Sequence, residues 1–189
     1  MQTVSVIRRY LQVSRRSFKA AADKPPSTRV ERIFQCAPSF YRYLYSEVGR
    51  ANYWTDRLAW SDRDIQTHLN SPNVQLHGLT CHGGPAGYFE LVRLDERVVE
   101  IAYLGVLPEF QGRGLGKYLL TAAVQTGFGA GATRVQLDTC TLDHPHALEN
   151  YLKRGFKVVQ TERFYRALPV TESERAAFVH GLVRTAEYG

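Results

Sequence analysis

The residues best suited to chemistry form a glycine-rich loop at positions 111–117. The loop reads Gln-Gly-Arg-Gly-Leu-Gly-Lys, with glycine at positions 112, 114 and 116. Glycine lets the backbone turn tightly and approach a ligand without obstruction from a Cβ atom. Where such a loop leads into a helix, its free N–H groups and the helix dipole favour a phosphate group. The loop therefore predicts a site for a phosphate-containing anion, with a ligand-free glycine turn as the simpler alternative.

Two common nucleotide-binding motifs do not fit this loop. A Walker A motif needs glycine at position 111 and serine or threonine at position 118, where the chain has Gln111 and Tyr118. A dinucleotide motif starting at Gly112 needs glycine at position 117, where the chain has Lys117. The spacing thus excludes both classes.

The spacing of apolar residues changes at this loop, from the pattern of a strand before it to that of a helix after it. An apolar stretch at 97–107 precedes the loop and predicts a strand. Residues 117–128 then place Leu119, Leu120 and Val124 on one side, as an amphipathic helix does. A strand at 134–140, a short helix at 146–154 and an extended stretch at 156–167 follow.

The pattern Gln111-x-x-Gly114-x-Gly116, between an apolar strand and a helix, resembles the pyrophosphate-binding signature of the GNAT superfamily of acyl-CoA-dependent N-acetyltransferases. The resemblance continues to Ala147-x-x-x-Tyr151-x-x-x-Gly155-Phe156, the second signature, and covers residues 74–160. It implies that backbone amides of the loop hold the diphosphate of acetyl-CoA, the co-substrate.

By this resemblance we expect a set of cofactor-binding residues on the strand, the loop and the start of the second helix. They are Leu104, Val106, Leu107, Gln111, Gly112, Arg113, Gly114, Leu115, Gly116, Lys117, His144 and Ala147. His144 stands where many members have an asparagine that contacts the pantetheine arm. A role in contacting coenzyme A or relaying protons is weighed against a simple helix-cap role.

The resemblance also implies direct transfer of the acyl group from the thioester to a primary amine. The leaving thiolate needs a proton, and a tyrosine with a pKa of about 10 is well matched to supply it. Tyr151 occupies the position of the family's tyrosine, so we expect it to be the general acid. The alternative is a packing tyrosine beside Leu148 and Leu152.

Glu100 is the candidate general base. In a regular strand it shares one face with Val98, Ala102, Leu104 and Val106, while Val99, Ile101, Tyr103 and Leu107 share the other. A carboxylate in such a buried row is paired or has a raised pKa, which makes it a better base. Glu100 lies eleven residues before Gln111, the offset of the base in the histone-acetyltransferase branch. The alternative is a structural pair with Arg97 or Arg134, and Glu90 is a weaker candidate.

Gly105 is a permissive place for the strand bulge that the resemblance implies. A backbone N–H between Leu104 and Val106 is then expected to hold the oxyanion. Cys140, His144 and His146 fall short of the four ligands of a structural zinc site, so we expect no metal. Cys140 has no activating neighbour in the sequence and is interpreted as a small core residue.

The order of elements predicts an α/β fold with a single mixed, mostly antiparallel central sheet and helices on both faces. Residues 1–28 are expected to form a basic strand and loop extension, residues 29–168 the GNAT-like domain, and residues 169–189 a tail helix opened by a capping box at Thr171 and Glu174. A mitochondrial transit peptide is the alternative for the basic N-terminus.

The composition restricts the kind of ligand, the cellular compartment and the partners that we expect. The 189 residues carry a formal net charge of +6, which suits an anionic ligand. Three cysteines without a CxxC pair indicate a reducing compartment, and no apolar run approaches the roughly 20 residues of a membrane helix. We therefore expect a cytoplasmic enzyme, monomeric or homodimeric, that has no membrane partner. A non-catalytic acyl-CoA sensor and a nucleic-acid-binding protein are the alternatives, the last disfavoured because the aromatic residues follow core spacing.

The acceptor is expected to be a small-molecule or peptide amine. In the superfamily the first helices, the loop between them and the last strands form its pocket. Candidate lining residues, equally compatible with a place in the core, are Tyr41, Tyr45, Trp54, Trp60 and Phe164. Asp56 and Arg57 are candidates to bind a charged acceptor or each other.

Overall fold

The structure, a computed structural model, describes residues 1–21, 23–169 and 187–188. From residue 97 to residue 168 its helices and strands follow the order expected from the sequence. In chain order they are β1 Gln2–Ser14, β2 Thr28–Ile33, α1 Pro38–Gly49, η1 Arg50–Asn52, α2 Asp62–Leu69, β3 Val74–Cys81, β4 Gly84–Arg93, β5 Val98–Val106, η2 Pro108–Phe110, α3 Leu115–Gly129, β6 Arg134–Cys140, α4 Ala147–Lys153, β7 Lys157–Leu168 and β8 Glu187–Tyr188.

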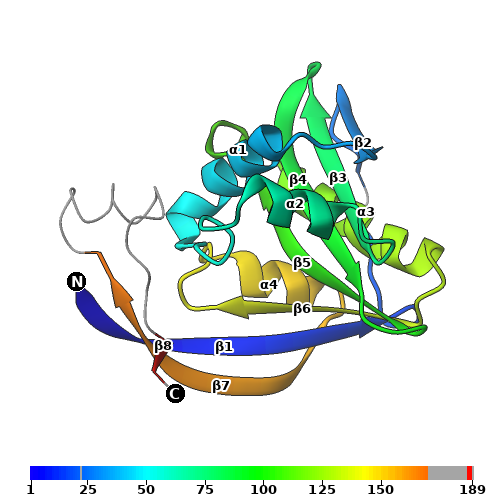
Figure 1. Cartoon of the computed structure of the whole chain (residues 1–189). Helices are drawn as coiled ribbons and strands as arrows, with labels where there is room; N and C mark the ends of the chain where they lie inside the picture. The colour runs from blue at the N-terminus through cyan, green and yellow to red at the C-terminus, as the bar shows by residue number, and fades with distance from the viewer. Residues whose placement is uncertain (22, 170–186, 189) are drawn as a thin grey trace.

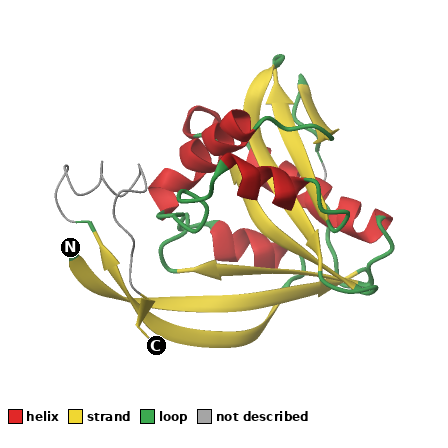
Figure 2. Ribbon diagram, in the orientation of Figure 1, coloured by secondary structure: helices red, strands yellow, loops and turns green. Residues whose placement is uncertain are grey.

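One eight-stranded sheet runs through the molecule in the order β2-β3-β4-β5-β6-β1-β7-β8. β5 and β6 are parallel, and the other neighbouring strands are antiparallel. Figures 1 and 2 show β1 and β7 as long, curved strands of this sheet, which carries helices on both faces. The predicted fold class, a mixed and mostly antiparallel sheet between helices, is confirmed.

Local sequence signals explain several element boundaries. Ser61 caps α2: its hydroxyl accepts the N–H of Asp64, and the Asp64 carboxylate accepts the N–H of Ser61, a complete capping box. His82 and Gly83 have φ of 50° and 86°, the left-handed conformation that a tight hairpin between β3 and β4 requires. These local signals set the start of α2 and the turn between β3 and β4.

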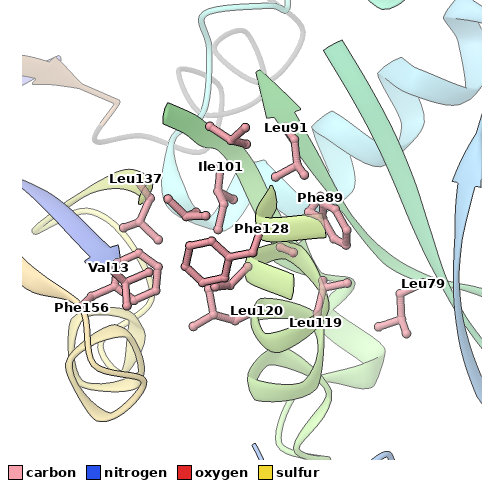
Figure 3. Packing of buried hydrophobic residues seen from close by; sticks show 14 of the residues in the cluster. Val13, Leu79, Phe89, Leu91, Ile101, Leu119, Leu120, Phe128, Leu137 and Phe156 are labelled. Atoms are coloured by element: carbon pink, nitrogen blue, oxygen red, sulfur yellow. The ribbon is translucent and has the colours of Figure 1, made fainter. Parts of the chain in front are cut away.

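The sheet has a hydrophobic core on each face. The α3-side core lies between the sheet and helices α3 and α4, and Figure 3 shows Phe128, Leu119 and Leu120 packed against β4, β5 and β6. The α1-side core lies under α1 and α2. Its buried members are Tyr41, Leu44, Tyr45, Val48, Ile65, Leu76, Tyr88 and Leu107. The two cores fix the sheet from both sides, so strand positions near the centre are held rigidly.

The opening strand lies inside the sheet. β1 pairs with β6 from Arg8 to Ser14 and with β7 from Gln2 to Gln12. Residues 1–28 are predicted to form a basic strand and loop extension, and the strand part of this segment is paired on both edges. Val6 and Leu11 are buried five positions apart and therefore lie on opposite faces of β1, so the strand contributes to both sides of the sheet. The expected tail helix falls almost entirely on residues outside the described ranges.

Candidate active site

The two parallel strands at the centre of the sheet separate along their length. β5 and β6 pair only from Val98↔Arg134 to Glu100↔Gln136, although β5 continues to Val106 and β6 to Cys140. Figure 1 shows the two ribbons diverging beyond this point. We call this region the split. Its facing strand edges have no ladder between them, so their backbone groups are available to a ligand.

The glycine loop stands at the carboxyl end of β5 and leads directly into α3. Gly112 and Gly114 have φ of 75° and 76°, a conformation that favours glycine. Gly114 is the N-cap of α3, and no side chain caps the first turn. The N–H groups at this helix start are thus presented to a ligand, as anion binding requires.

Gly116 indicates space for a ligand, because the fold itself does not need a glycine at this position. Its φ is not in the left-handed range, and a Cβ atom built on it would meet nothing within 4 Å. The side chain of Lys117 folds back over the loop, so that its Cε lies 3.1 Å from the point where a Cβ atom on Gly114 would be. A bare backbone beside an ammonium group matches the needs of a diphosphate.

The other predicted cofactor-binding residues divide into two groups. Gln111 donates from Nε2 to the carbonyl of Val106 at 3.5 Å, which ties the loop to the end of β5. The N–H of Leu107 donates to the carbonyl of Ala86 at 2.9 Å, so that donor is already used within the protein. Leu115 is buried in the α3-side core, and Leu104 is half-buried against it.

His144 and Ala147 lie after β6, at the start of α4. His144 is exposed and its Nδ1 accepts the N–H of His146 at 3.3 Å. Ala147 donates its N–H to the carbonyl of His144 at 2.8 Å. Because both residues follow β6, they lie at the β6 edge of the split, whereas the glycine loop follows β5 at the other edge.

Tyr151 lies on α4, packed against the α3-side core with its ring centroid 5.9 Å from that of Phe156. Burial raises the pKa of Tyr151 well above its usual value, and the negative charges of Asp143 and Asp138 raise it further. The hydroxyl is therefore protonated at neutral pH. This is the form that a general acid needs.

Glu100 stands at the vertex of the split, in the last parallel pair. Its Oε1 accepts a hydrogen bond from Gln136 Nε2 at 3.3 Å, rather than pairing with Arg97 or Arg134. The side chain is half-buried. The residue therefore lies next to the region where the strands separate.

The expected bulge is present in β5, but at another residue. Glu90 pairs with Tyr103 and Leu91 with Ile101, so Ala102 is the extra residue, while pairing around Gly105 is regular. Because of this extra residue, Leu104 and Val106 lie on the opposite face of the sheet from Glu100. The prediction that these three side chains share one face was therefore wrong. Gly105 instead makes room for Val48, next to Trp54.

The family model described as the acetyltransferase (GNAT) family matches residues 32–156, which contain the split, the glycine loop and Tyr151. The chain belongs to the GNAT acetyltransferase family.

Relatives and solved structures agree with this assignment. An uncharacterized N-acetyltransferase of Mycobacterium tuberculosis (strain CDC 1551 / Oshkosh) is 35% identical over 97 residues, 51% of this chain and 62% of that protein. A GCN5-related N-acetyltransferase from Kribbella flavida has a TM-score of 0.62 at 19% identity, covering 84% of this chain and 56% of that one. A GNAT family acetyltransferase from Elizabethkingia anophelis with acetyl-CoA bound has a TM-score of 0.53 at 19% identity, covering 71% and 79%. The chain spans only about three fifths of the length of the first two proteins.

On its α1 side this GNAT acetyltransferase has a buried polar network centred on Glu90, which is fully buried. The Glu90 carboxylate accepts hydrogen bonds from Tyr41 Oη at 2.8 Å and Arg57 Nη1 at 2.9 Å, and lies 2.7 Å from His68 Nε2. Burial alone would raise the pKa of Glu90, but the hydrogen bond with His68 and the charge of Arg57 outweigh it and hold the pKa below its usual value. The carboxylate is thus a paired, buried anion.

The sequence ranked Glu90 only as a weak candidate and did not predict this network. A charged residue within the apolar run of β4 is the signal that pointed to a buried partner. Its partner Arg57 could not be identified, because the two residues lie 33 positions apart. Tyr41 and Tyr45 prove to be core residues, Trp54 and Trp60 are half-buried, and Phe164 is buried on β7.

The cysteines and histidines add no second site. All three cysteines are free, and burial raises the pKa of Cys140, which keeps the thiol protonated. In residues 1–21, 23–169 and 187–188, no group of three or more His, Cys, Asp or Glu side chains is arranged to hold a metal ion. Over the same residues, every helix is too short or too polar to cross a membrane.

Proposed function

We propose that this protein transfers an acetyl group from acetyl-CoA to a primary amine by direct attack. The observation that carries the proposal is the glycine loop at the start of α3, open toward a split in the sheet. Backbone N–H groups there suit the diphosphate, and the split admits the thioester arm. The neighbour from Elizabethkingia anophelis, which has acetyl-CoA bound, supports the same donor.

The residues around the split have complementary roles in this reaction. The amine nitrogen forms a bond to the thioester carbonyl carbon, and a backbone N–H of β5 stabilises the oxyanion. As the carbon–sulfur bond breaks, Tyr151 gives its proton to the thiolate and Glu100 takes the proton of the amine. Exchange with water restores both groups. We further propose a reducing, cytoplasmic setting, in line with the three free cysteines.

Two measurements test the proposal. Acetyl-CoA binds only the folded state, so at millimolar concentration it should raise the melting temperature, whereas NADH should not. Free thiol should then be released in the presence of a panel of amines, polyamines, amino acids and peptides. A thermal shift without thiol release on any acceptor would favour a non-catalytic acyl-CoA sensor. The lack of any shift would remove the donor substrate and overturn the proposal.

A further inference from the structure

The segment between the first two helices, residues 53–60, is irregular in structure but fixed by contacts with several elements. Trp54 fills the space left by Gly49, where a Cβ atom would lie 2.6 Å from the Trp54 Cβ. Thr55 Oγ1 accepts a hydrogen bond from Arg166 of β7 at 2.6 Å. We call this segment the 53–60 loop. It is held in one position over the α1 side of the split.

Arg57 is the main anchor of the 53–60 loop. Its guanidinium group forms the buried ion pair with Glu90 and lies 4.5 Å from the ring centroid of Trp60 and 4.7 Å from that of Tyr103. The arginine therefore does not pair with Asp56, its neighbour in the chain. The loop is attached through Arg57 to β4 and β5 together.

Asp56, in contrast, is exposed. Its Oδ2 accepts a hydrogen bond from Tyr103 Oη at 3.3 Å, and Tyr103 follows the bulge residue of β5 directly. This bond places the carboxylate at the rim of the split, on the face of the sheet that carries Glu100. A charged group already held in position loses little entropy when it binds a ligand.

Further carboxylates lie on the sheet near Asp56. Partial burial raises the pKa of Asp138 on β6; Arg8 opposes this from 3.5 Å, and the charges of Asp143, Glu100 and Asp56 add to it. A carboxylate at the rim of the split, with others near it, favours a cationic acceptor over an acidic one.

We propose that Asp56 determines acceptor specificity by binding a second, cationic group of the amine substrate, and that Arg57 positions Asp56 through Glu90. The acceptor class is then a diamine or longer polyamine, in which one nitrogen reacts and another stays protonated. This inference rests on the proposed function and adds the substrate class to it.

The first test compares two acceptors of equal length, 1,4-diaminobutane and butylamine. The wild-type protein should prefer the diamine in kcat/KM by about tenfold or more, since a charge-assisted contact is worth that factor. Asp56→Asn should reduce the preference to below about threefold through the KM of the diamine, with the KM of acetyl-CoA unchanged. Asp62→Asn, which alters an exposed carboxylate paired with Arg42 outside the site, is the matched control. A preference that survives in Asp56→Asn would overturn the proposal, as would a wild-type protein that favours butylamine.

The second test does not depend on turnover. Calorimetry in the presence of coenzyme A should show that 1,4-diaminobutane binds the wild-type protein about tenfold more tightly than Asp56→Asn. Equal binding, or none to the wild type, would overturn the inference even if other amines are acetylated, whereas binding without acetylation would overturn the proposed function alone.

Arg57→Met should lose the same diamine preference while it keeps its thermal shift with acetyl-CoA. Retention of the preference in a folded Arg57→Met protein would contradict the positioning role.

Discussion

The glycine loop and the Glu90 network are built in opposite ways. The glycine loop offers bare backbone, with room around Gly112 and Gly116 that the protein itself does not fill. The Glu90 network is a buried ion pair with Arg57 among aromatic rings. The first is a local structure made by neighbouring residues, whereas the second is a tertiary structure that supports the 53–60 loop.

This difference predicts that ligand binding and folding stability depend on different residues. Gly116 of the glycine loop contributes little to packing, so its replacement should change ligand affinity more than folding. Residues of the Glu90 network are desolvated ions, so loss of one partner leaves an unpaired buried charge. The predictions below test this contrast in order of expected size.

Glu90→Gln should have the largest effect on stability. It leaves the Arg57 charge without its buried partner, which should lower the free energy of unfolding by about 3 kcal/mol. Urea denaturation at pH 7 measures the change. The matched control is Glu47→Gln, which removes a surface pair between half-buried Glu47 and exposed Arg50 and should cost below about 0.5 kcal/mol. Similar losses of unfolding free energy in both variants would show that the buried network stabilises the fold no more than a surface pair does.

The pH dependence of stability sharpens the same contrast. The pKa of Glu90 in the folded protein lies below its ordinary value of 4.5, so the unfolded chain binds the proton more readily. Its contribution is therefore complete above that value and is lost as the pH falls through the folded pKa. The difference in unfolding free energy between wild type and Glu90→Gln should shrink as the pH falls below about 4.5. A difference that grows on acidification would contradict the lowered pKa.

Tyr151→Phe should affect chemistry alone. Loss of a general acid should reduce kcat by about 100-fold, while the KM of acetyl-CoA and the melting temperature stay nearly constant. Steady-state thiol release measures the rate. Tyr165→Phe, an exposed tyrosine on β7, serves as the control. If Tyr151→Phe keeps more than half of the wild-type rate, the tyrosine is a packing residue.

Gly116→Ala should change binding and stability in opposite directions. Alanine is the better helix former and has space at this position, so the unfolding free energy should rise by about 0.5 kcal/mol. Its methyl group should obstruct the diphosphate and weaken acetyl-CoA binding by about tenfold. Titration calorimetry and thermal unfolding measure the two effects.

Gly129→Ala is the matched control and the smallest expected effect. It lies at the end of the same helix, also with nothing within 4 Å of a Cβ atom, and should stabilise without altering acetyl-CoA binding. Equal binding by wild type, Gly116→Ala and Gly129→Ala would mean that the loop is only a turn.

The sequence predicted those parts of the fold that depend on neighbouring residues. Gly112, Gly114 and Gly116 predicted the loop before α3, because backbone freedom acts over a few residues. The fold class, a mixed and mostly antiparallel sheet with helices on both faces, also followed from the order of elements along the chain.

The bulge could not be placed from the sequence. Strict alternation put Glu100 and Leu104 on one face, but a single extra residue at Ala102 reversed the faces of β5 beyond it. A bulge is fixed by how two strands pair, and nothing in the sequence of one strand reports that pairing. Gly105 attracted the prediction because glycine permits irregularity, yet its absent side chain serves Val48 and Trp54 instead.

By itself the sequence determined the glycine loop of this protein, since a tight turn with bare backbone needs only a short run of glycines before a helix. Only the tertiary structure decided the Glu90 network and the place of the 53–60 loop. There Arg57, Glu90 and Asp56 come from a loop and a strand that are distant in the chain, and burial selected which acid the arginine pairs with and which acid stays exposed at the rim.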